Sequence, residues 1–191
     1  MTRARRPVAI AVTGGIGAGK SEALKAFARH GAAVISSDEI VHRLLRDDEE
    51  VRRKLAERFG ADVIGPEGAD RARIAELVFA DSEQLAWLEG LLHPRVVREY
   101  LAWHERQTTP FTVSEIPLLY ETGGEERFDH VVVITAPPEV RAQRARVDAA
   151  EREQRLLPDE EKARRADFVY VNDGSLEELD AFVADVLAHV S

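Results

Sequence analysis

Residues 14–21 combine glycines, a lysine and a serine in an order that suits phosphate binding. They read Gly-Gly-Ile-Gly-Ala-Gly-Lys-Ser and fit the pattern G-x-x-x-x-G-K-[ST]. Glycines let a backbone wrap closely around phosphate oxygens, and successive N–H groups then point into the loop. Lys20 can reach the β- and γ-phosphates of ATP, and the Ser21 hydroxyl can coordinate Mg²⁺. We therefore predict a site for ATP and magnesium in this segment.

The predicted nucleotide site also includes the residue that follows the motif, Glu22. Its carboxylate would repel the α-phosphate unless it turns outward. Alternatively, Glu22 is a first-turn acid that the helix dipole favours. The residues predicted to bind the nucleotide through this loop are Gly15, Ile16, Gly17, Ala18, Gly19, Lys20, Ser21 and Glu22.

A strand and a helix must hold the loop in place. Residues 8–12 form a continuous apolar run, as expected for a strand that is buried on both faces of a parallel sheet. Residues 19–30 have helical apolar spacing and are followed by Gly31, a common helix terminator. A second short strand at 33–35 completes a β-α-β unit, which opens many nucleotide-binding folds.

The middle of the chain, residues 39–107, predicts helices without a convincing strand, with a loop at 60–68. We interpret this part as a helical substrate-binding insert. Further apolar patterns predict three more strands, at 111–113, 131–135 and 168–171. An arginine-rich charged segment at 139–165 is predicted to be helical, and an amphipathic helix is predicted at 176–187.

Composition narrows the class of protein. The chain has 191 residues, 45% hydrophobic and 32% charged, a globular balance, and a formal charge of −9 that argues against a broad nucleic-acid surface. It contains no cysteine, which excludes disulfides and thiolate metal sites. No apolar run approaches the roughly 20 residues of a membrane span, and the run after the basic residues 1–7 is too short for a signal peptide. We expect a cytoplasmic enzyme.

Several stretches in order resemble the dephospho-CoA kinase family over nearly the whole chain. They are Thr13 to Ser21, Val34 to Ile40, Leu92-His93-Pro94-Arg95-Val96, Ile116 to Glu121, Ala136 to Val140, and Ala166 to Ser175. The resemblance implies an α/β P-loop kinase fold with a five-stranded parallel sheet. It also implies transfer of the γ-phosphate of ATP to the ribose 3′-hydroxyl of dephospho-CoA.

The resemblance further implies a division of the chain by role. The nucleotide-binding core would comprise residues 1–38, 108–138 and 166–191, with a helical CoA-binding insert at 39–107 and a lid at 139–165. Between Arg146 and Pro158 the lid is several residues shorter than is usual in the family. The expected partners are ATP and dephospho-CoA, with no nucleic acid or membrane, in a monomer or weak homo-oligomer.

Two acidic residues carry implied roles at the ends of strands. Asp38 matches the family carboxylate that accepts or orients the proton of the attacking hydroxyl, although it or Ser37 could instead cap the next helix. The family usually has Asp-Ala-Asp here, so Ser36 removes one carboxylate. Glu115 follows a buried strand and is implied in holding Mg²⁺ through water; otherwise it is a polar strand end.

The resemblance places substrate contacts at Asp38, His93 and Glu121. Alternatively, His93 has a structural role and Pro94 alone accounts for this stretch by bending a helix. In the lid, Arg144 is the implied catalytic arginine, and Arg141, Arg146 and Arg152 lie in the same segment. The alternative is that these arginines belong to a solvated charged helix. Asn172 matches a family loop near the adenine, or forms an Asx-type turn.

Two other functions compete with this interpretation. One is a small P-loop kinase for a nucleoside, a sugar or shikimate, which the 93–94 and 116–121 stretches fit less well. The other is a non-catalytic nucleotide-binding protein, suggested by Glu22, Ser36 and the short lid. The chain lacks the Asn-Lys-x-Asp sequence with which a GTPase reads guanine.

Overall fold

The computed structural model describes residues 6–79, 81–144 and 156–191. The chain divides into two compact units. The first, here called the nucleotide unit, comprises residues 1–36 and 104–191, and the second, the helical unit, comprises residues 37–103. Each is described by itself. Within the described residues, no helix is both long enough and apolar enough to cross a membrane.

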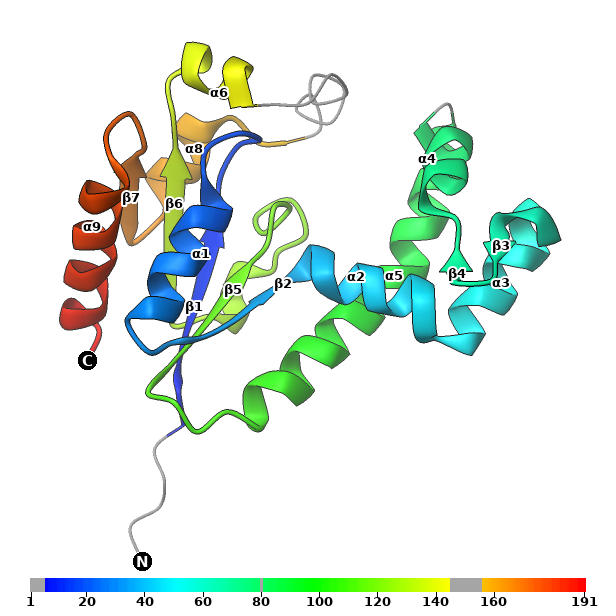
Figure 1. Ribbon diagram of the computed structural model, residues 1–191, viewed down its shortest axis with the longest axis horizontal. Coiled ribbons are helices and arrows are strands. Elements are labelled where there is room, and N and C mark those ends of the chain that lie inside the picture. The colour runs from blue at the N-terminus through cyan, green and yellow to red at the C-terminus, as the bar shows by residue number, and fades with distance from the viewer. Residues whose placement is uncertain (1–5, 80, 145–155) are drawn as a thin grey trace, which may run out of the picture. The chain divides into compact units, whose positions relative to one another are not determined.

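A five-stranded sheet forms the centre of the nucleotide unit, and all its strand pairs are parallel, in the order β2-β5-β1-β6-β7 (Figure 1). This confirms the predicted α/β fold. β1 lies in the middle, which explains its continuous apolar run: Ile10, Ala11 and Val12 are fully buried. The strands are β1 Val8–Thr13, β2 Ala33–Ser36, β5 Phe111–Glu115, β6 His130–Thr135 and β7 Phe168–Val171.

The register of the sheet aligns the carboxyl ends of three strands. Glu115 at the end of β5 lies opposite Val12 of β1 on one side and Ser36 of β2 on the other. The segment 14–19 leaves β1 at this edge, and the chain leaves β2 here toward Asp38. Ligands of open parallel sheets bind outside the carboxyl ends of the strands, so this edge is where the site must be sought.

Different segments cover the two faces of the sheet. Helices α1 (Lys20–Arg29) and α9 (Leu176–His189) lie against one face (Figure 1), where Phe27 and Leu179 join the core. On the other face, Leu119 and Tyr120 pack against strand residues. Among the described residues, this unit also contains η2 Glu125–Arg127, α6 Pro138–Arg144 and α8 Asp159–Arg165.

The described residues of the helical unit are mainly helical. Asp48 caps α3 by accepting a hydrogen bond from the backbone N–H of Val51 at 3.0 Å. Helix α5 continues through Pro94, although proline supplies no N–H for the helical ladder. The helices are α2 Ser37–Asp47, α3 Glu49–Phe59, η1 Ala61–Val63, α4 Arg71–Phe79 and α5 Ser82–Glu105, the last of which continues past residue 103.

One expectation for this unit was wrong. Residues 39–107 were predicted to lack strands, but β3 (Ile64–Gly65) and β4 (Gly68–Ala69) pair as a small antiparallel hairpin. Strands of two residues are too short to show the alternation that marks a strand in a sequence. The predicted loop at 60–68 therefore contains most of a tight hairpin.

Candidate active site

Lys20 lies folded over the glycine loop at the carboxyl edge of the sheet. It is the first residue of α1, is only 9% exposed, and its Nζ donates a hydrogen bond to the Gly15 carbonyl at 2.9 Å. A positive charge held beside a helix N-terminus and a loop of backbone N–H groups favours an anion. The loop therefore has the arrangement that the sequence predicted for binding nucleotide phosphates.

Asn172 fixes the far end of the loop. Its side-chain amide donates to the Ala18 carbonyl at 2.8 Å, and the residue is 5% exposed. Gly19 has φ +97°, and a β-carbon there would overlap the Asn172 amide, so that only glycine fits. This contact with Ala18 was not predicted from the sequence. The predicted place of Asn172 near the adenine stays a prediction.

Glu22 points away from the loop. Its carboxylate pairs with Lys25 on the same face of α1, at 2.7 Å between Oε1 and Nζ. This ion pair directs the negative charge toward solvent, and so removes the repulsion that a carboxylate would otherwise exert on a phosphate. A nucleotide contact by Glu22 stays a prediction.

Two oxygen-bearing side chains are available for a magnesium ion. Ser21 is exposed in the first turn of α1, and Glu115 is partly buried at the end of β5. Hydroxyl and carboxylate oxygens are ligands that Mg²⁺ prefers, and this ion commonly takes one or two protein ligands together with phosphates and water. Among the described residues no three His, Asp or Glu side chains cluster to hold a metal. The two residues fit an ion held largely by the nucleotide.

The lid arginines differ in their positions. Arg144 is exposed, with its Nη1 3.8 Å from the place a β-carbon would take on Gly19. Arg141 lies instead at the Gly15 end of the loop, where it pairs with Asp159. Asp159 was not predicted to take part in the site, because it stands in an ordinary run of acidic residues. Arg146 and Arg152 lie outside the described residues, as does much of the predicted lid.

A buried ion pair connects α8 to the segment that follows β5. Lys162 is fully buried; its Nζ lies 3.0 Å from Glu121 Oε1 and donates to the Pro117 carbonyl at 3.2 Å. Glu121 Oε1 also accepts from the Leu157 backbone N–H at 2.7 Å. Lys162 lies within a charged run, so no local pattern indicates that it is buried. Glu121 therefore holds this segment, and its expected substrate contact stays a prediction.

Tyr120 lies next to this ion pair. Burial raises the pKa of its hydroxyl to about 12, although the Arg165 guanidinium, 4.2 Å from the ring centre, acts in the opposite direction. The Tyr120 hydroxyl has no hydrogen-bond partner among the described residues. The side chain thus serves packing and is no acid or base near neutral pH.

In the helical unit, the predicted functional residues lie on the surface. Asp38 is exposed in the first turn of α2, two positions after the end of β2, and His93 is exposed on α5. The structure brings Lys20, Asn172, Arg144 and the loop together within the nucleotide unit. It holds Asp38 and His93 in the other unit, so their place beside the loop stays a prediction.

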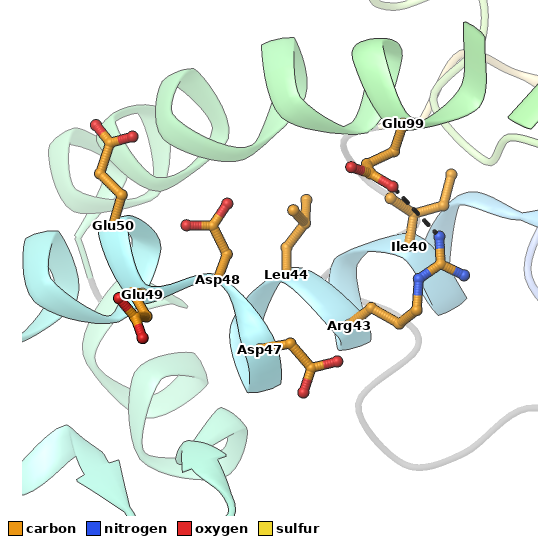
Figure 2. A pocket seen from close by; sticks show the side chains of 8 residues that line it. All are labelled: Ile40, Arg43, Leu44, Asp47, Asp48, Glu49, Glu50 and Glu99. Carbon is orange, nitrogen blue, oxygen red and sulfur yellow. Dashed lines mark ion pairs between the residues drawn. The ribbon is translucent and has the colours of Figure 1, made fainter. Parts of the chain in front are cut away.

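A pocket of about 380 Å³ lies within the helical unit (Figure 2). Arg43 reaches toward Glu99 across it, at 3.8 Å between Nη2 and Oε2. Hydrogen bonds from Lys54 and Arg95 hold the pKa of Glu50 below its usual range. Acidic side chains dominate the lining, which disfavours phosphate groups. The lining residues are Ile40, Arg43, Leu44, Asp47, Asp48, Glu49, Glu50 and Glu99.

Comparisons with solved structures agree with this fold. A crystal structure of a Thermus thermophilus protein superposes with a TM-score of 0.83 at 34% identity, covering 98% of this chain and 100% of that one. A dephospho-CoA kinase from Campylobacter jejuni gives a TM-score of 0.68 at 26% identity, covering 98% and 99%. A shikimate kinase from Bacteroides thetaiotaomicron, with a TM-score of 0.52 at 18% identity, shares the fold alone.

Sequence comparison identifies the family. A dephospho-CoA kinase from Protochlamydia amoebophila is 36% identical over 182 residues, covering 89% of this chain and 90% of the relative. One from Thermus thermophilus is 36% identical over 195 residues, covering 98% and 94%. The family model described as dephospho-CoA kinase matches residues 8–178. The resemblance inferred from the motifs is confirmed, and the chain belongs to the dephospho-CoA kinase family.

Proposed function

We propose that this chain transfers the γ-phosphate of ATP to the ribose 3′-hydroxyl of dephospho-CoA, making coenzyme A and ADP. The observation that carries the proposal is the Lys20 ammonium on the Gly15 carbonyl, 2.9 Å away, in a phosphate loop of a dephospho-CoA kinase family member. The bond from the 3′-oxygen to the γ-phosphorus forms as the bond to the β,γ-bridging oxygen breaks. No covalent enzyme intermediate is needed.

Residues of the nucleotide unit hold and polarise the nucleotide. Lys20 binds the β- and γ-phosphates, and Arg144 neutralises charge on the transferring group. Asn172 keeps the loop in shape through its bond to Ala18. Ser21 and, through water, Glu115 would hold Mg²⁺, which supplies charge neutralisation on the phosphate oxygens when bound.

Residues of the helical unit act on the acceptor, together with Glu121. Asp38 takes the proton of the attacking 3′-hydroxyl, a role that suits a carboxylate open to solvent and substrate. His93 contributes to binding dephospho-CoA. Glu121 Oε1 holds Lys162, and Oε2 is buried with no hydrogen-bond partner among the described residues, so the proposed substrate contact of Glu121 rests on the family resemblance.

Family membership supports a phosphotransferase with a hydroxyl acceptor and not a non-catalytic binding protein. Likeness to shikimate kinases extends to the fold alone and does not favour shikimate as the acceptor. We further propose that the enzyme works in the cytoplasm as a monomer or weak homo-oligomer, as the motifs and the acidic composition led us to expect.

The test is an assay of ATP consumption and CoA formation with purified protein, Mg²⁺ and dephospho-CoA. We expect CoA from the wild type and almost none from Lys20→Ala or Asp38→Ala. Glu39→Ala is the matched control, because Glu39 is an exposed acid beside Asp38 in the same helical turn. ATP binding without CoA formation by the wild type would refute the proposal and direct the search to other hydroxyl acceptors.

A further inference from the structure

The pair of Arg141 and Asp159 lies directly on the phosphate loop. Arg141 Nη1 donates to Asp159 Oδ2 at 3.3 Å, with the two side chains 21% and 22% exposed. A β-carbon on Gly15 would overlap the Arg141 guanidinium and lie 2.9 Å from Asp159 Oδ2. On Gly17 it would lie 2.9 Å from the Arg141 carbonyl oxygen. The middle of α6, at Arg141, is therefore packed on the first half of the loop.

The position along the loop indicates which phosphates are concerned. Gly15, under the guanidinium, is the residue whose carbonyl holds the Lys20 ammonium at 2.9 Å. Lysines of such loops reach the β- and γ-phosphates. Arg141 thus lies on the Gly15 side of the loop, where the Lys20 ammonium is bonded, whereas Arg144 approaches the loop from the Gly19 side.

The charges of Arg141 and Asp159 would have opposite effects on a bound nucleotide phosphate. A carboxylate within a few ångströms of a nucleotide phosphate opposes binding unless a cation neutralises it. A guanidinium has five N–H donors in a planar fork and can hold a carboxylate and a phosphate oxygen together. Removing Arg141 would take away a phosphate ligand and would also expose the phosphates to the charge of Asp159.

We propose that Arg141 is a ligand of the terminal phosphates of ATP and that Asp159 is its positioning residue. The inference rests on the proposed function only in taking a nucleoside triphosphate as the occupant of the loop. It adds a second arginine to Arg144, with a distinct place and a distinct partner.

Equilibrium binding of ATP, ADP and AMP, without dephospho-CoA, tests the proposal on the full chain. Arg141→Ala should weaken ATP binding by about 10- to 100-fold, the loss expected for a charge-assisted hydrogen bond, and should affect AMP little. The double variant Arg141→Ala/Asp159→Asn should recover a several-fold part of the ATP affinity. The matched control is Arg29→Ala, because Arg29 forms an exposed pair with Asp180 at the opposite end of α1.

Each outcome bears on the proposal. An equal loss for ATP and AMP, or a lowered melting temperature with unchanged nucleotide affinities, would show a structural role for Arg141 and overturn it. Absence of recovery in the double variant would overturn the assignment of Asp159. The binding assay does not depend on CoA formation. A wild type that binds ATP but makes no CoA in the activity assay would therefore refute the proposed function without contradicting this inference.

Discussion

The buried residues that hold the phosphate loop in the nucleotide unit differ in exposure from the predicted functional residues of the helical unit. In the nucleotide unit, Lys20 and Asn172 are buried and each is bonded to a loop carbonyl. In the helical unit, Asp38 and His93 are exposed. Binding a phosphate needs preorganised dipoles and charges, whereas accepting a proton from a bulky substrate needs an accessible carboxylate. Changes at the buried loop residues should therefore alter stability and nucleotide affinity, and changes in the helical unit should alter turnover or the binding of dephospho-CoA.

The largest expected effect separates chemistry from binding. Asp38→Asn should lower kcat by about 10²- to 10⁴-fold, the usual contribution of a general base. ATP affinity and melting temperature should stay unchanged, since Asp38 is exposed. Steady-state kinetics with calorimetric ATP titration would measure this, with Glu39→Gln as the neighbouring control. A large loss of stability would break the contrast between the two units.

The buried ion pair tests the opposite behaviour in the nucleotide unit. Lys162→Met should lower the free energy of unfolding by about 3–5 kcal/mol, because it leaves the Glu121 carboxylate buried without its partner. Adding Glu121→Gln should restore part of this, since the amide oxygen can still accept from Leu157.

Urea unfolding of these variants measures the effect. Arg53→Met removes one partner of a pair in which both side chains are 59% exposed, and it should change the stability by less than about 1 kcal/mol. A loss at Lys162 no greater than that at Arg53 would contradict the prediction.

Alkaline pH should reveal the burial of Tyr120. Its pKa is about 12 in the folded chain and 10.0 when unperturbed. Between these values the unfolded state loses the proton and the folded state keeps it, so stability falls as pH rises from 10 to 12. The loss is at most about 3 kcal/mol, at 1.36 kcal/mol for each pKa unit.

Tyr120→Phe removes the titrating group and should make the alkaline decline shallower. At pH 8 the variant should be nearly as stable as the wild type, because the hydroxyl has no partner among the described residues. Denaturant unfolding at pH 8 and pH 11 compares the two proteins. A stability difference that is the same at both pH values would show that Tyr120 does not titrate in this way.

The smallest effect is expected at His93. Because this side chain is exposed, His93→Ala should leave the melting temperature unchanged and raise the KM for dephospho-CoA a few-fold, with the KM for ATP unaffected. Arg98→Ala, at another exposed position of α5, serves as the control. An unchanged KM for dephospho-CoA would contradict a substrate contact by His93 and would favour a structural role of Pro94 in the helix.

Much of the fold and part of the site could be predicted from local pattern. The apolar run at 8–12, the glycine loop and the helix after it carry their signals within about 25 residues. The hairpin at 64–69 was missed because its strands are two residues long. Asp159 and Lys162 were missed because exposed and buried charges look alike in a charged run, and only a partner distant in the sequence distinguishes them.

The sequence by itself determined the family, through the order of its motifs along nearly the whole chain. It also determined the first strand and the phosphate loop with its lysine and serine, because periodicity and glycine spacing are local properties of the chain. Only the tertiary structure decided that Asn172 pins Ala18, that Lys162 is buried against Glu121 and that Arg141 rather than Arg144 covers Gly15. These contacts join residues from 41 to 154 positions apart. The packing of helices and strands brings such pairs together, and no local pattern encodes which of many similar charges will meet.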